Sequence, residues 1–81
     1  MQIETQGWTI HIFDDHFRGY FENDETGVGG ELLFERRGDV IELIDYDGVF
    51  ELPRPVFKAL GEQGIHMEPE FDPDYEIGEH S

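Results

Sequence analysis

The sequence predicts a small α+β domain: an antiparallel β-sheet of four to five strands, one C-terminal helix and an acidic extended tail. Three observations lead to this expectation. Short segments in the first half alternate bulky apolar and polar residues, and turns rich in Gly, Asp and Asn separate them. One later segment carries apolar residues at helical spacing instead. The last stretch is rich in acids and proline, and a length of 81 residues allows a single domain.

Alternation along the chain identifies the strands. The segment 8–13 places its bulky apolar residues on one face, which is typical of a half-buried strand. In the next strand, Phe17, Gly19 and Phe21 are expected to share a face. The segment 40–44 is the least polar and is expected to be central. The predicted strands cover residues 8–13, 16–22, 31–35, 40–44 and 49–52, of which the last could equally lead into the helix.

The helix is predicted over about residues 53–63. Proline is tolerated in a first helical turn, where its missing N–H has no partner in any case. Val56, Phe57 and Leu60 form one apolar stripe at helical spacing. Gly64 then suits a left-handed C-terminal cap, which ends the helix.

Composition divides the chain into two parts. Residues 1–65 are expected to form one β-rich domain that includes the helix, and residues 66–81 an acidic tail without Lys or Arg. Proline breaks any helix in the tail. Phe71 and Tyr75 could pin this segment to the domain, so an extended tail and a packed one are both left open.

Charge is the outstanding feature of the chain. Twenty Asp and Glu face five Lys and Arg, which gives a formal net charge of −15. A magnitude of roughly 2–8 is enough to keep a small domain soluble, so a partner or the environment is expected to explain the excess. The cations form no basic patch, which excludes direct binding to nucleic acid. The first residues lack a signal-peptide pattern and no apolar run approaches ~18 residues, so we expect a cytoplasmic protein without membrane contact.

Two glycine-containing motifs are better explained as turns than as ligand sites. The run Asp45-Tyr46-Asp47-Gly48 begins like a calcium loop, but its fifth and twelfth positions are valines. The glycine-rich segment 27–30 leads into a strand and carries no Lys. A phosphate-binding loop leads into a helix, and here the surrounding acids would repel the anion.

Side chains for catalysis or metal binding are equally scarce. His11, Asp14, Asp15 and His16 are of metal-ligand types, but their spacing matches no standard site. The chain has no Cys, and its single Ser is the last residue. We therefore expect no enzymatic activity, no catalytic residue, no metal and no cofactor.

In size and charge the chain resembles small phage or plasmid inhibitors that imitate DNA. Carboxylates two apart on a strand lie ~6.6 Å from each other, and duplex DNA is likewise a dense row of charges. The resemblance implies an acidic inhibitor that occupies the basic groove of a nucleic-acid-binding protein. The residues expected to bind this partner combine carboxylates with aromatic anchors. They are Asp45, Tyr46, Asp47, Glu68, Glu70, Phe71, Asp72, Asp74 and Tyr75.

Two alternatives fit the same composition. An immunity-type or antitoxin-type protein would also be acidic and bind a basic partner, but without imitating DNA. A halophilic or simply very soluble domain would need no partner, and the presence of a single lysine, Lys58, agrees with this alternative. Competition by duplex DNA would separate the first alternative from mimicry, and dependence of folding on molar salt would indicate the second.

Overall fold

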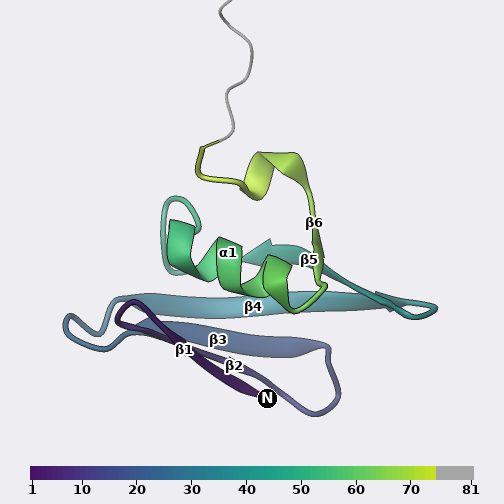
Figure 1. Ribbon diagram of the computed structural model, residues 1–81, viewed down its shortest axis with the longest axis horizontal. Helices are drawn as coiled ribbons and strands as arrows, with labels where there is room; N and C mark the ends of the chain where they lie inside the picture. The colour runs from purple at the N-terminus through teal and green to yellow at the C-terminus, as the bar shows by residue number, and fades with distance from the viewer. Residues whose placement is uncertain (75–81) are drawn as a thin grey trace, which may run out of the picture.

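The computed structural model describes residues 1–74 and shows a twisted six-stranded sheet with one helix packed against it (Figure 1). The sheet order follows the chain, β1 to β6. The elements are β1 (Gln2–Thr5), β2 (Trp8–Ile12), β3 (Arg18–Asn23), β4 (Gly29–Arg37), β5 (Val40–Tyr46), α1 (Arg54–Glu62), β6 (His66–Met67) and a 3₁₀ helix (Pro69–Phe71).

The α+β class predicted from the sequence is confirmed, with two corrections to the sheet. Five strands form an antiparallel meander, but β6 runs parallel to β5, so the sheet is mixed. It has six strands, because β1 and β6 were not predicted. Residues 49–52 form no strand: residues 49–51 are bends, and the segment leads into the helix. Strand β6 begins directly after residue 65, where the sequence predicted the start of a tail.

The core lies between α1 and one face of the sheet. Ile3, Ile10 and Phe21 are consecutive register partners on β1, β2 and β3, so their side chains share this face. Each fully buried aliphatic or aromatic side chain contributes roughly 1.5–3 kcal/mol of transfer free energy. The buried residues are Ile10, Ile12, Phe21, Leu32, Phe34, Leu43, Leu52, Val56, Ala59, Leu60 and Ile65.

Helix α1 agrees closely with its prediction. Val56 and Leu60 are fully buried, while Phe57 packs at the margin of the core. Gly64 follows the helix with a φ of 84°. The N–H of Ile65 donates to the carbonyl of Leu60, and Ile65 itself is buried, as expected for a hydrophobic contact at a left-handed cap. No helix within residues 1–74 is long and apolar enough to cross a membrane.

Strand β3 shows the predicted alternation except at its start. Gly19 and Phe21 are buried, and Arg18, Tyr20 and Glu22 point to the other side. Phe17 was expected beside Gly19 and Phe21, but it precedes the strand and its side chain is exposed. The carbonyl of Phe17 still accepts the N–H of Phe34, so its backbone continues the ladder although its side chain leaves the core.

Two glycines, Gly30 and Gly48, allow the loop after β5 to cross the beginning of β4. A Cβ on Gly30 would lie 1.8 Å from the carbonyl oxygen of Asp47, and a Cβ on Gly48 would lie 2.2 Å from that of Gly29. Gly48 also has a φ of 85°, which L-residues with side chains rarely adopt. The crossing fixes the position of Asp47 against β4.

Candidate functional site

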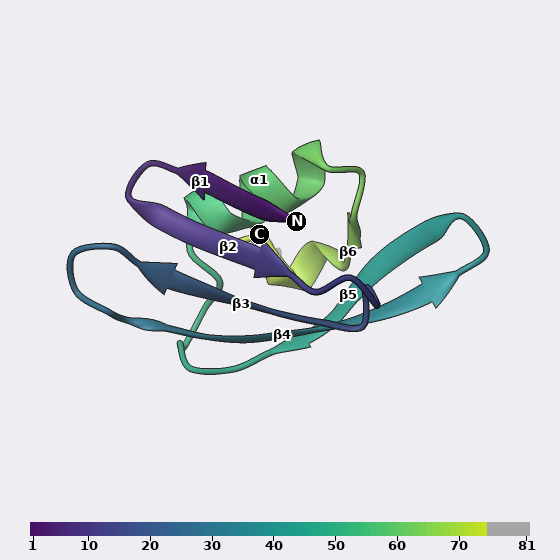
Figure 2. The same cartoon turned by 90° about the horizontal axis from the view of Figure 1, so that it is seen from below.

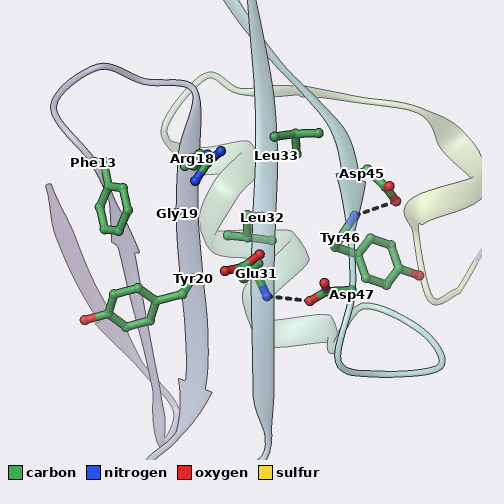
Figure 3. Close-up of a pocket in the computed structure, with 10 residues that line it drawn as sticks. All are labelled: Phe13, Arg18, Gly19, Tyr20, Glu31, Leu32, Leu33, Asp45, Tyr46 and Asp47. Atoms are coloured by element: carbon green, nitrogen blue, oxygen red, sulfur yellow. Dashed lines mark hydrogen bonds between the residues drawn. The ribbon is translucent and has the colours of Figure 1, made fainter.

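The face of the sheet opposite α1 is not covered by any element of residues 1–74, as the view in Figure 2 and the helix behind the sheet in Figure 3 show. We call it the open face. His11, Tyr20 and Glu31 are register partners on β2, β3 and β4, so their side chains form a row across it. The open face is therefore built from the polar-face positions of the meander.

An aromatic cluster of His11, Phe13 and Tyr20 lies on the open face. The rings of His11 and Tyr20 stack with centroids 5.4 Å apart, and Phe13 meets both rings edge-on at 5.2 and 6.2 Å. Phe13 is 40% exposed and Tyr20 39% exposed. Exposed aromatic side chains that pack together in this way are typical of protein-binding surfaces.

Beside the cluster the open face is hollowed into a depression of about 280 Å³ (Figure 3). Phe13 and Tyr20 form one side of it. Glu31 lies between them and the carboxylates of Asp45 and Asp47, which come from the end of β5 and the residue after it. The depression thus combines an aromatic wall with three carboxylates.

Hydrogen bonds orient two of these carboxylates. One oxygen of Asp47 accepts the N–H of Glu31 at 2.9 Å, where the loop after β5 crosses β4. One oxygen of Asp45 accepts the N–H of Tyr46 at 2.8 Å. A carboxylate has a second oxygen with its own lone pairs. Each aspartate is therefore held in place with acceptor capacity left.

Carboxylates outnumber cations on the rest of the open face. Register and alternation place these acids on it: Glu4, Glu22, Glu31, Glu35, Glu42 and Asp45. The guanidinium of Arg37 lies 3.2 Å from Glu35 and 3.4 Å from Glu42. The hydrogen bond to Glu35 and the charge of Glu42 raise the pKa of Arg37. Arg18 lines the depression and forms no ion pair within residues 1–74.

The structure places the predicted partner-binding residues in two groups. Asp45 and Asp47 line the depression, and Tyr46 between them is half-buried. The ring of Tyr46 meets that of Phe71 edge-on at 5.4 Å. This contact fastens the 3₁₀ helix to the side of the sheet that carries α1 (Figure 1).

The remaining predicted residues lie in this 3₁₀ helix or close to either end of it. Asp74 pairs with Arg54 at the start of α1, at 2.5 Å, and Asp72 accepts the N–H of Asp74. Glu68, which directly precedes the 3₁₀ helix, and Glu70, which lies within it, are both exposed. Tyr75 lies outside the described residues. The predicted acids of this segment and the depression are therefore not brought into one site.

Sequence reasoning missed the aromatic cluster and Glu31. The available signal was the presence of Phe13 and Tyr20 at positions that alternate with buried residues. A solvent-facing strand position usually carries a polar side chain, so large aromatic side chains at such positions depart from the expected pattern.

Two groups of possible metal ligands differ in their placement. Glu42, His66 and Glu68 bring their ligand atoms within 4.8 Å of one another at the β5–β6 edge. Glu42, with 12% of its side chain exposed, is already compensated by Arg37. The other group, around His11 and His16, does not assemble within residues 1–74. Instead His11 stacks on Tyr20.

Comparison with protein-family models gave no match, and comparison with characterised proteins and with solved structures gave no significant match. The function is therefore argued from the geometry and charge of the open face.

Proposed function

We propose that this protein is a non-catalytic acidic inhibitor that docks through its open face on a basic, nucleic-acid-binding protein. One observation carries the proposal: the uncovered side of the sheet joins an exposed aromatic cluster to a surround of carboxylates, on a chain of net charge −15. Immobile apolar anchors within a charged rim are the usual composition of a specific protein interface.

Apolar side chains supply the centre of this interface. Phe13, Tyr20 and Leu33 are each exposed by about two-fifths, although they lie on regular or near-regular strand backbone. The rings of Phe13 and Tyr20 already pack against each other and against His11, so these two side chains lose little entropy when a partner covers them. We expect these residues to give specificity and a slow dissociation rate.

Carboxylates supply the rim and the long-range attraction. A net charge of this size steers a basic partner toward the chain and raises the association rate, most strongly at low salt. Because a groove that binds phosphates also attracts carboxylates, a nucleic-acid-binding protein is the partner class that fits best. We propose that the acidic face occupies that groove in place of nucleic acid.

Capture from a lysate tests the proposal. The full chain is immobilised, lysate is passed over it, and retained proteins are identified while NaCl is raised. We expect one basic, nucleic-acid-handling protein to be retained and to be displaced by duplex DNA. If a partner is retained but duplex DNA does not displace it, the protein does not imitate DNA, and an immunity-type or antitoxin-type role explains the binding. If nothing specific is retained, the proposal is wrong.

Two variants with equal net charge show which surface is used. One removes three carboxylates of the open face by the substitutions Glu4→Gln, Glu22→Gln and Glu31→Gln. The control removes three others by Glu25→Gln, Glu62→Gln and Glu70→Gln. We expect the partner to elute at clearly lower salt from the first variant alone. An equal loss from both would mean that net charge, and not the open face, governs binding.

A further inference from the structure

We infer that the depression of the open face is a receptor for one arginine side chain of the partner. The inference deepens the proposed function and rests on it. Its basis is the juxtaposition described above: Phe13 and Tyr20 lie on one side, Asp45 and Asp47 lie on the other, and Glu31 lies between them (Figure 3). A guanidinium is the protein group that both sides of this arrangement recognise.

The aromatic side suits the flat guanidinium. Arginine stacks on aromatic rings and is more weakly hydrated than lysine, so it loses less when it is covered. Tyr20 is held by the stacked ring of His11, with 5.4 Å between centroids, and Phe13 stands at 62° to His11. The rings are therefore fixed before a ligand arrives.

The acidic side suits the fork of N–H donors. A guanidinium donates two parallel hydrogen bonds to carboxylate oxygens, and such charge-assisted pairs are stronger than neutral ones. Backbone N–H groups hold one oxygen of Asp45 and one of Asp47, at 2.8 and 2.9 Å. The free oxygens are thus positioned, and Glu31 adds a third carboxylate between them and the rings.

The size and the charge of the depression together favour a side chain over a larger ligand. Its volume of about 280 Å³ lies just below the range of roughly 300–1,000 Å³ that is usual for small-molecule sites. It is open on the sheet surface and is lined by outward side chains such as Phe13, Tyr20 and Glu31. One side chain of a docked protein fits it better than a cofactor or a nucleotide, whose phosphates the carboxylates would repel.

Arg18 gives the inference a specific consequence. It lines the same depression and forms no ion pair within residues 1–74, so its charge opposes an incoming cation. Arg18→Gln is therefore expected to strengthen arginine binding, about threefold at ~0.1 M salt. Arg36→Gln, which removes the same charge near the end of β4, is the matched control and should change binding little.

The experiment uses the full ¹⁵N-labelled chain and three blocked tripeptides, Gly-Arg-Gly, Gly-Lys-Gly and Gly-citrulline-Gly. Citrulline has the shape of arginine without its charge. We expect the arginine peptide to shift the amide signals around Tyr20, Glu31 and Asp47 with a millimolar Kd. The lysine peptide should bind several-fold more weakly, and the citrulline peptide should cause no saturable shift.

Variants then test the two sides of the depression. Tyr20→Ala and Glu31→Gln should each weaken arginine binding about fivefold to tenfold, whereas Glu62→Gln, on the helix, should not. Preserved dispersion of the spectra shows that each variant is folded. Equal binding of the arginine and lysine peptides, or shifts spread over acids throughout the surface, would overturn the inference.

The two proposals can fail separately. If one basic protein is captured and displaced by duplex DNA but the arginine peptide binds no better than the lysine or citrulline peptide, the arginine receptor is wrong while the proposed function stands. If the arginine peptide binds as described but no basic protein is captured, the receptor stands and the proposed function is wrong.

Discussion

At the scale of single residues, the crossing at Gly48 gives the sharpest stability prediction. Gly48→Ala would combine a strained φ of 85° with a Cβ only 2.2 Å from the carbonyl oxygen of Gly29. Strain alone costs about 1 kcal/mol, and a clash with backbone forces the loop away from β4. We expect the free energy of unfolding to fall by about 3 kcal/mol, measured by urea denaturation.

Gly27→Ala is the matched control for this substitution. Gly27 has a comparable φ of 76°, but nothing lies within 4 Å of the position where its Cβ would be. It should cost about 1 kcal/mol, the strain term alone. Equal costs at both positions would show that the close approach at Gly48 is relieved without loss of stability.

Only some residues of the open face could be predicted from the sequence. The sequence predicts Asp45 and Asp47 as partner-binding residues because they lie in a turn that combines acids with an aromatic residue. The structure places both in the depression. The sequence does not predict Phe13 and Tyr20 as partner-binding residues. Their role depends on which face α1 covers, and on the register that aligns Tyr20 with His11 and Glu31. Neither the covered face nor the register can be read from one segment of sequence.

At the scale of elements, the strands with long alternating patterns and the helix were predictable, and the two edge strands were not. The turn before β2 is formed by Gln6 and Gly7, with φ of 48° and 83°. Two consecutive positive φ values are typical of a tight hairpin turn, but Asn-Gly or Asp-Gly is its usual signal, so β1 was missed. Strand β6 has two residues and exists because α1 returns the chain beside β5.

Helix α1 carries a correctable electrostatic defect. Its last turn has no basic residue, and it ends at the acidic Glu62, where the helix dipole favours a cation. We expect Glu62→Lys to stabilise the protein by about 0.5–1 kcal/mol in thermal denaturation. Glu25→Lys, in the β3–β4 turn, alters the net charge equally. An equal gain from both would assign the effect to total charge instead of the dipole.

At the scale of the whole molecule, the charge of −15 predicts a salt-dependent stability. Raising NaCl from 0.1 to 1 M shortens the screening length from about 10 to about 3 Å. Relief of repulsion by on the order of 1 kcal/mol would raise the Tm by about 4–8 °C in a domain of this size. Calorimetry in NaCl and in KCl checks this, since screening does not depend on which monovalent cation is used.

The same melts address the halophilic alternative. A chain that is folded at 0.1 M salt and gains a few degrees fits an acidic protein with a partner. A chain that is unfolded at 0.1 M and folds only near molar salt would assign the acidity to the environment. A Tm that is unchanged or lowered by salt would contradict the expectation that repulsion destabilises the fold. The triple Glu→Gln variants should show a weaker salt dependence than the wild-type chain.

The position of α1 late in the chain has a consequence for the order of folding. Five strands pair with their sequence neighbours through short turns, so their ladders close with little loss of chain entropy. Their apolar face, however, remains exposed to solvent until residues 52–65 pack against it. During synthesis the meander therefore leaves the ribosome with both of its faces uncovered. Residues 52–65 then cover the apolar face, and the polar open face is the one that remains available to a partner.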